Sequence, residues 1–166
     1  MLDNQEKTFS EHRKERSQRL QHLKNPNSIS EIIEISDGDT ILARYIPSKT
    51  IQKPGLNFYS NDSEFIQFGV WGYDAGKVLP AHVHNQIKRT SNSTQEALFV
   101  QRGKIKAMIF DLSGSKIKEI EVSQGEVLIL LHGAHGYEII EDHTQVLEFK
   151  NGPYVGAERD RKRIES

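Results

Sequence analysis

The chain has 166 residues, with 22 Lys and Arg against 23 Asp and Glu, and a formal net charge of −1. This balance argues against nucleic acid or an anionic membrane surface as the main partner. The chain has no cysteine, which excludes disulfides, zinc–thiolate sites, iron–sulfur clusters and cysteine nucleophiles. Its length suits one domain with a core of its own.

The first segment, residues 1–26, is polar apart from a thin apolar stripe that includes Phe9, Leu20 and Leu23. This pattern predicts a helical extension, ended by the Asn25-Pro26-Asn27 break. It lacks the apolar centre of a secretory signal, and no apolar run in the chain is long enough to span a bilayer. We therefore expect a cytoplasmic protein that does not enter a membrane.

From residue 27 to residue 152 the pattern predicts β structure. The stretch EIIEISDGDTILARYI indicates a hairpin around Asp37-Gly38, and residues 47–64 read as a loop with one short apolar element near Phe58. Further strands are predicted at 65–73, 77–84, 95–102, 104–111, 116–122, 126–131, 135–141 and 144–150. Many short strands separated by turn signals predict an all-β, antiparallel sandwich or barrel. Residues 153–166 form a charged tail with a short helix expected over ERDRKRI.

Two histidines lie one residue apart in the predicted strand 77–84. Because side chains alternate along a strand, His82 and His84 are expected on the same face. Glu96 opens the next strand, and His135 follows a further strand. Three imidazoles and one carboxylate form a ligand set for one divalent first-row metal ion, and ligand type alone does not choose between Fe, Mn, Ni, Cu and Zn.

These residues carry a resemblance to a known family. GKVLPAHVH at 76–84, followed by EALFVQRG at 96–103, resembles the first motif of the cupin superfamily. GEVLIL at 125–130, followed by Gly133 and His135, is similar to the second motif. The stretches TQEALFV, LHGAHGYEIIED and EFKNGPYVG further resemble small bacterial cupins that are associated with surface-sugar biosynthesis. The resemblance spans about residues 65–150.

The resemblance implies a double-sheet jelly roll with a mononuclear metal site. It implies a homodimer and a small-molecule ligand, such as a sugar or a hydroxy or keto acid, and an enzyme of isomerase or oxygenase type. In two places the chain departs from the family pattern. The polar loop at 85–94 makes the step from His84 to Glu96 longer than usual, and the second motif lacks its proline. The second departure leaves His132 as a competitor of His135 for the third histidine position.

Other residues are candidates for binding or catalysis around this site. Lys88 and Arg89 lie on the polar loop, where cations could hold an anionic or sugar-acid group. Trp71 and Tyr73 share a strand face and could form an apolar wall. Tyr137 shares a face with His135 and could orient a substrate through its hydroxyl, or it could be a core aromatic residue.

The last predicted strand leaves two interpretations open. If Leu147 and Phe149 face the core, Glu148 and Lys150 form an exterior ion pair. If the face is reversed, Glu148 and Lys150 become acid–base groups of the site. The function likewise has two readings, since a metal-dependent enzyme and a non-catalytic module that binds a sugar or small metabolite would use the same scaffold.

Overall fold

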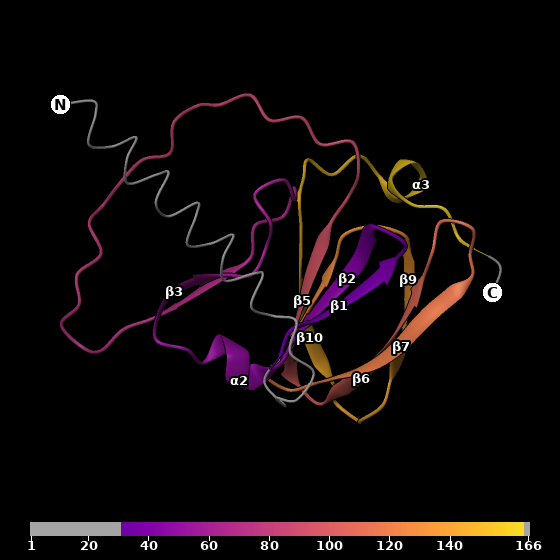
Figure 1. The fold of residues 1–166 in the computed structure, drawn as a ribbon, viewed down its shortest axis with the longest axis horizontal. Helices are drawn as coiled ribbons and strands as arrows, with labels where there is room; N and C mark the ends of the chain where they lie inside the picture. Colours follow the sequence, from indigo (N-terminus) through magenta and orange to yellow (C-terminus); the bar gives the residue numbers. More distant parts are fainter. Residues whose placement is uncertain (1–30, 165–166) are drawn as a thin grey trace.

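The computed structural model describes residues 31–164 of the chain, and Figure 1 shows its elements. The N-terminal helical extension predicted for residues 1–26 lies outside this part. The described strands are β1 (Ile33–Asp37), β2 (Thr40–Ile46), β3 (Gly55–Phe58), β4 (Gly69–Gly72), β5 (Glu96–Arg102), β6 (Lys104–Phe110), β7 (Lys116–Ser123), β8 (Val127–Leu130), β9 (Ala134–Ile139) and β10 (Gln145–Lys150). Two short helices, α2 (Ser48–Ile51) and α3 (Ala157–Asp160), complete the described elements.

The strands form three antiparallel sheets. The largest has five strands in the order β1-β2-β8-β5-β10, the second has three in the order β7-β6-β9, and β3 pairs with β4. The predicted all-β, antiparallel class is confirmed. Within residues 31–164 the sheets do not join through hydrogen-bonded strands into one closed barrel.

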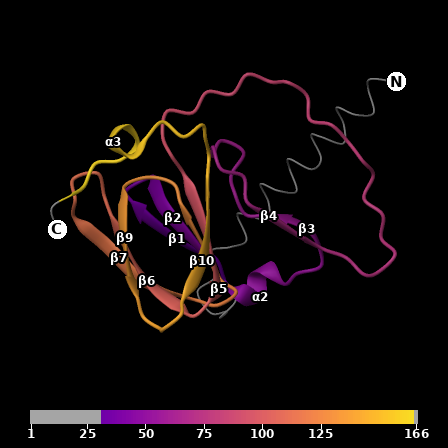
Figure 2. The same cartoon turned by 180° about the vertical axis from the view of Figure 1, so that it is seen from behind.

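A first apolar core fills the space between the five-stranded and three-stranded sheets. Its buried members come from both sheets: Ile35, Leu42, Ala43, Leu98, Val100, Ile105, Ala107, Ile109, Val122, Leu128 and Leu130. Residues two apart in β5 and in β6 enter this core, as the alternation of side chains along a strand requires. The figures show the two sheets facing each other (Figures 1 and 2).

A second apolar cluster covers the opposite face of the five-stranded sheet at its central strands β2, β8 and β5. Ala97, Val127 and Ile129 point to this side, where Tyr59, Phe68 and neighbouring apolar residues of the segment 59–70 pack against them. All four residues of β8 are buried, which agrees with its continuous apolar sequence VLIL. The five-stranded sheet is therefore the middle layer of the described chain.

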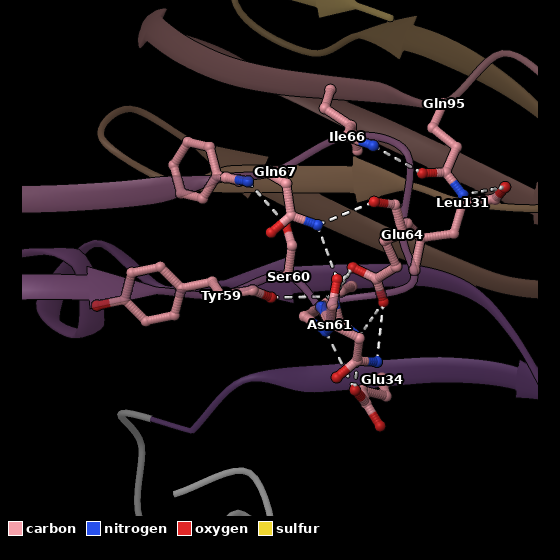
Figure 3. A network of polar contacts seen from close by, with 11 residues as sticks. Glu34, Tyr59, Ser60, Asn61, Glu64, Ile66, Gln67, Gln95 and Leu131 are labelled. Carbon is pink, nitrogen blue, oxygen red and sulfur yellow. Dashed lines mark hydrogen bonds and ion pairs between the residues drawn. The ribbon is translucent and has the colours of Figure 1, made fainter. Parts of the chain in front are cut away.

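A buried arginine holds the second layer in place. Arg44 of β2 is fully buried, and its guanidinium donates hydrogen bonds to Glu34, to Glu64 and to the carbonyl oxygen of Tyr59. Glu64 also accepts hydrogen bonds from the backbone and side-chain amides of Asn61. Figure 3 shows the carboxylates and the surrounding polar contacts. Because a buried guanidinium needs a counter-charge, this network fixes the segment around residues 59–64 to the sheet.

Glycine is required where the chain passes from β8 to β9. Gly133 has φ of 76°, and a Cβ atom there would lie 2.2 Å from the carbonyl oxygen of Phe110. No other residue fits this close approach with a left-handed backbone. The turn sets where β9 begins, and thus where His135 lies.

Most of the predicted elements are confirmed. The hairpin at Asp37-Gly38 and the strands predicted between 95 and 150 correspond to β1, β2 and β5–β10. The strand predicted at 65–73 is reduced to β4, and the C-terminal helix to α3. The strand predicted at 77–84 is wrong, because these residues are irregular and exposed. An isolated strand has no hydrogen-bond partner for its backbone, and Pro80 donates none.

The described residues contain no helix that is long and apolar enough to cross a membrane.

We predict that Arg44→Met destabilises the fold by about 3–5 kcal/mol, because it leaves the buried Glu64 carboxylate without its cation. Urea unfolding followed by far-ultraviolet circular dichroism measures the change. Lys104→Met is the matched control, since it breaks the solvent-exposed ion pair with Glu121, and a much smaller change is expected. An unchanged unfolding midpoint for Arg44→Met would contradict the role given to the network.

Candidate functional site

Glu96 is a buried carboxylate at the start of β5. Its position follows from strand alternation, since Leu98 and Val100 on the same face belong to the core between the two larger sheets. The Glu96 side chain is only 9% exposed. A charged group at such a position requires partners of opposite charge or hydrogen-bond donors.

Two side chains from other strands supply these partners. Lys150 Nζ of β10 lies 2.8 Å from Glu96 Oε1, and His135 Nε2 of β9 lies 3.4 Å from Glu96 Oε2. The second contact lacks the geometry of a hydrogen bond, and Glu96 Oε2 has no hydrogen-bond partner within the described chain. One carboxylate oxygen is therefore bound by a cation, while the other faces an imidazole without a bond to it.

The pairing of β10 with β5 decides the open question about the last strand. Lys150 lies opposite Glu96 and Glu148 lies opposite Leu98, so both point to the inner face. Lys150 Nζ is also 2.8 Å from Glu148 Oε1. Of the two interpretations of the sequence, the structure has the one with Glu148 and Lys150 beside the site. Leu147 and Phe149 occupy the outer face of the strand and are 43% and 55% exposed.

His135 and Tyr137 approach from the facing sheet. They lie opposite Ile109 and Ala107 of β6, whose side chains belong to the core, and their ring centroids are 5.4 Å apart. Tyr137 is 39% exposed. The structure thus brings five of the predicted site residues into one group, which we call the Glu96 cluster: Glu96, His135, Tyr137, Glu148 and Lys150.

The charges in the Glu96 cluster shift its protonation equilibria. Burial favours the neutral form of Glu96, but the contacts with His135 and Lys150 outweigh it and lower the pKa of Glu96 to about 2. Partial burial, together with the negative charges of Glu96 and Glu148, raises the pKa of Tyr137. Although burial opposes it, the hydrogen bonds to Glu148 and Glu96 raise the pKa of Lys150. The cluster therefore holds an ionised carboxylate, an ammonium and a protonated phenol.

The remaining predicted ligands lie elsewhere. His82 and His84 are exposed on the long segment between β4 and β5, which both views draw away from the two larger sheets (Figures 1 and 2). Their ring centroids are 5.0 Å apart. Lys88 and Arg89 follow on the same segment and are also exposed. His132 is exposed in the turn before β9, and the contact with Glu96 is made by His135.

The two aromatic candidates form a separate surface feature. Trp71 and Tyr73 stack with their ring centroids 6.4 Å apart, and Lys77 Nζ lies 5.5 Å from the centre of the Tyr73 ring. Trp71 is 63% exposed. Trp71 and Tyr73 therefore contact each other where β4 leads into the long segment, and they are not members of the Glu96 cluster.

The predicted metal-ligand set is divided into two pairs. Two donors bound to one ion at about 2.1 Å lie about 3.0–3.4 Å apart for octahedral or tetrahedral angles. The 3.4 Å between Glu96 Oε2 and His135 Nε2 fits this spacing, and the oxygen has no competing hydrogen bond. Within residues 31–164, however, no three His, Asp or Glu side chains lie close enough together to hold a metal. The predicted four-ligand site would require His82 and His84 to lie beside Glu96 and His135.

Asn151, which was not among the residues predicted from the sequence, fixes the chain beside the cluster. Its side chain accepts a hydrogen bond from the Gln95 backbone and donates to Ser91 Oγ and to the carbonyl oxygen of Ser93. The Gln95 side chain is buried and accepts a hydrogen bond from the Ile66 backbone, as Figure 3 shows. The Asn-Gly pair after the last strand was the available signal, since asparagine readily bonds to nearby backbone groups.

Comparison of the chain with protein-family models, with curated proteins and with solved structures gave no match.

We predict that the metal-free protein loses stability as the pH falls from about 4.5 towards 2, partly through Glu96. A carboxylate with a lowered pKa in the folded state stabilises the fold above its unfolded pKa and loses this effect as the pH falls through the folded one. Glu96→Gln is expected to remove this component. Unfolding by urea across this pH range, with chelator present, measures it.

The matched control for Glu96 is Glu148→Gln, which keeps Glu96 and both of its partners in place. It is expected to retain the loss of stability at low pH. An identical pH dependence in wild type and Glu96→Gln would show that Glu96 does not contribute.

Proposed function

We propose that this chain is a cupin of the jelly-roll type that binds one divalent first-row metal ion through His82, His84, Glu96 and His135. We further propose that it is a mononuclear metal-dependent enzyme, of isomerase or oxygenase type, acting on a small polar metabolite such as a sugar or a hydroxy or keto acid. The motif resemblance supports the family, and the Glu96 cluster supports an enzyme.

One observation carries the proposal. A buried carboxylate oxygen without a hydrogen bond faces an imidazole nitrogen at the separation expected for two donors of one ion. Such an unsatisfied oxygen is costly in a fold unless something else binds it. The sequence has two further imidazoles, His82 and His84, on the segment that leads into β5, and they would complete a ligand set.

When bound, the metal ion would supply Lewis acidity or a site for oxygen activation. The surrounding residues of the Glu96 cluster would bind the substrate and transfer protons. Tyr137 keeps its phenol proton, because its pKa is raised, and would donate a hydrogen bond to a substrate oxygen. Lys150 would orient a carboxylate or hydroxyl group by charge. Glu148, whose carboxylate lies 2.8 Å from Lys150 Nζ, would accept a proton from a hydroxyl or carbon of the substrate.

We predict that the wild-type protein binds about one equivalent of metal per chain and that Glu96→Gln or His135→Ala lowers this to below roughly a tenth. His84→Ala is expected to have the same effect. Elemental analysis after equilibrium dialysis against Co(II), Mn(II) or Zn(II) measures the content. His132→Ala is the matched control and is expected to keep the wild-type content. Unchanged metal content in His84→Ala would contradict the ligand set.

We predict that Tyr137→Phe keeps the metal content but lowers turnover by roughly 10–100-fold, the range for loss of one positioned proton donor. Conversion of a panel of sugars and hydroxy and keto acids, followed by mass spectrometry, gives the readout. Activity that persists in wild-type protein stripped of metal would contradict a metal-dependent enzyme.

A second candidate function is a non-catalytic module that binds a sugar or a small metabolite. The contact between Lys150 and Glu96 favours it, since the ammonium already neutralises the carboxylate at 2.8 Å. A cluster balanced in this way can bind polar ligands without a metal ion. Ligand binding by calorimetry in the presence of chelator, without conversion of the ligand, would support this alternative.

A further inference from the structure

We infer that the N-terminal extension, residues 1–26, docks through its apolar stripe on the exposed side of the β3–β4 pair in the same chain. This inference is independent of the proposed metal site. The exposed side carries four large apolar residues, which we call the β3–β4 face: Leu56, Phe58, Trp71 and Tyr73.

The register of the two strands places these side chains together. Leu56 pairs with Trp71, and Phe58 pairs with Gly69, so the members of each pair point to the same side. A Cβ atom at Gly69 would lie 2.7 Å from the Phe58 ring, which shows that this ring lies over the glycine. Tyr73 stacks with Trp71 just beyond the end of β4. The four side chains therefore form one continuous apolar surface.

This surface is exposed, although the other side of the pair is covered. Leu56 is 51% exposed, Phe58 45% and Tyr73 44%. On the opposite side, Val70 packs against the second apolar cluster. A sheet that is apolar on both sides is stable when both are buried. Since residues 31–164 leave the β3–β4 face this exposed, what covers it lies outside this range or in another molecule.

The described chain begins on the same side of the five-stranded sheet as β4. Ile32 is buried in the second apolar cluster, against which Val70 of β4 also packs. The predicted end of the extension is the Asn25-Pro26-Asn27 break. Residues 25–30 would span up to about 20 Å when extended. The extension can therefore reach the β3–β4 face of its own chain.

The apolar residues of the extension fit one narrow stripe. At about 100° per residue, the helix predicted for this segment would place its four large apolar side chains within about 60° of one another, namely Leu2, Phe9, Leu20 and Leu23. Leu20 and Leu23 come last, next to the break, so they would meet the face first. A polar helix with so thin a stripe gains its stability from the surface that covers the stripe.

The small size of the β3–β4 face favours the chain's own extension over a second copy. Four side chains form a much smaller contact than the interface that holds two separate proteins together. A short tether raises the effective concentration of the stripe to about the millimolar range, so a contact of this size is sufficient. A second copy or another protein would compete from a far lower concentration.

Fluorescence of the full-length chain tests the docking, because Trp71 is its only tryptophan. Leu20→Asp/Leu23→Asp is expected to move the Trp71 emission to longer wavelength and to raise its quenching by acrylamide about two- to threefold, since the indole becomes exposed to water. Gln18→Asp/Gln21→Asp adds the same charge away from the stripe. It is the matched control and is expected to keep the wild-type emission. Equal emission and quenching in all three proteins would overturn the inference.

Crosslinking identifies the chain that supplies the extension. Because the chain has no cysteine, Lys24→Cys beside the stripe and Lys77→Cys beside Tyr73 can be combined and treated with a short bismaleimide. A crosslink within the monomer is expected, and a mixture of the two single variants is expected to give no heterodimer. Lys24→Cys/Lys118→Cys, with its second position on β7, is the matched control and is expected to give much less product.

Two results of this crosslinking would overturn the inference. A heterodimer in the mixture, at the yield of the double variant, would show that a second copy occupies the β3–β4 face. No crosslink in the double variant would show that the extension lies elsewhere and leaves the face to a separate partner or ligand.

Discussion

Burial of both faces of the central strands β2, β8 and β5 is the constraint on which the rest of the structure depends. One face packs against β7-β6-β9 and the other against the segment around Tyr59 and Phe68. A strand such as β8 can then be apolar on both sides, and Arg44 can be buried on the second side only because Glu34 and Glu64 reach it. The middle layer is therefore packed on both sides at its centre, and the pairing of β5 with β10 sets the register that builds the Glu96 cluster.

Charge balance allows an ionised carboxylate to lie on the inner face of this middle layer. Glu96 lies on the core face of β5, the same face on which Leu98 and Val100 contribute apolar side chains to the core. It remains ionised because Lys150 and His135 offset the cost of its burial. The compensation is uneven, since Oε1 is bound to Lys150 while Oε2 has no hydrogen bond. A polar site is thus built at the point where the apolar core ends, between two strand edges.

The sequence predicted those features that depend on local pattern. The strands from β5 to β10 follow from alternation and turn residues, and the pairing of His135 with Tyr137 follows from the period of a strand. The facing of β10 could not be predicted, because QVLEFK places apolar residues on one face and charged residues on the other, and only the pairing with β5 decides between them. The burial of Arg44 could likewise not be predicted, since its partners Glu34 and Glu64 lie 10 and 20 residues away in the sequence.

The prediction of a strand at 77–84 is wrong for a different reason. Its alternation is real, but a strand needs an edge to pair with, and the chain's own geometry carries the segment away from β9 and β10. A local pattern therefore predicts a strand only where the fold also supplies an edge for that strand to pair with. In β5 and β10 the pattern and the pairing agree, and the predicted strands form there.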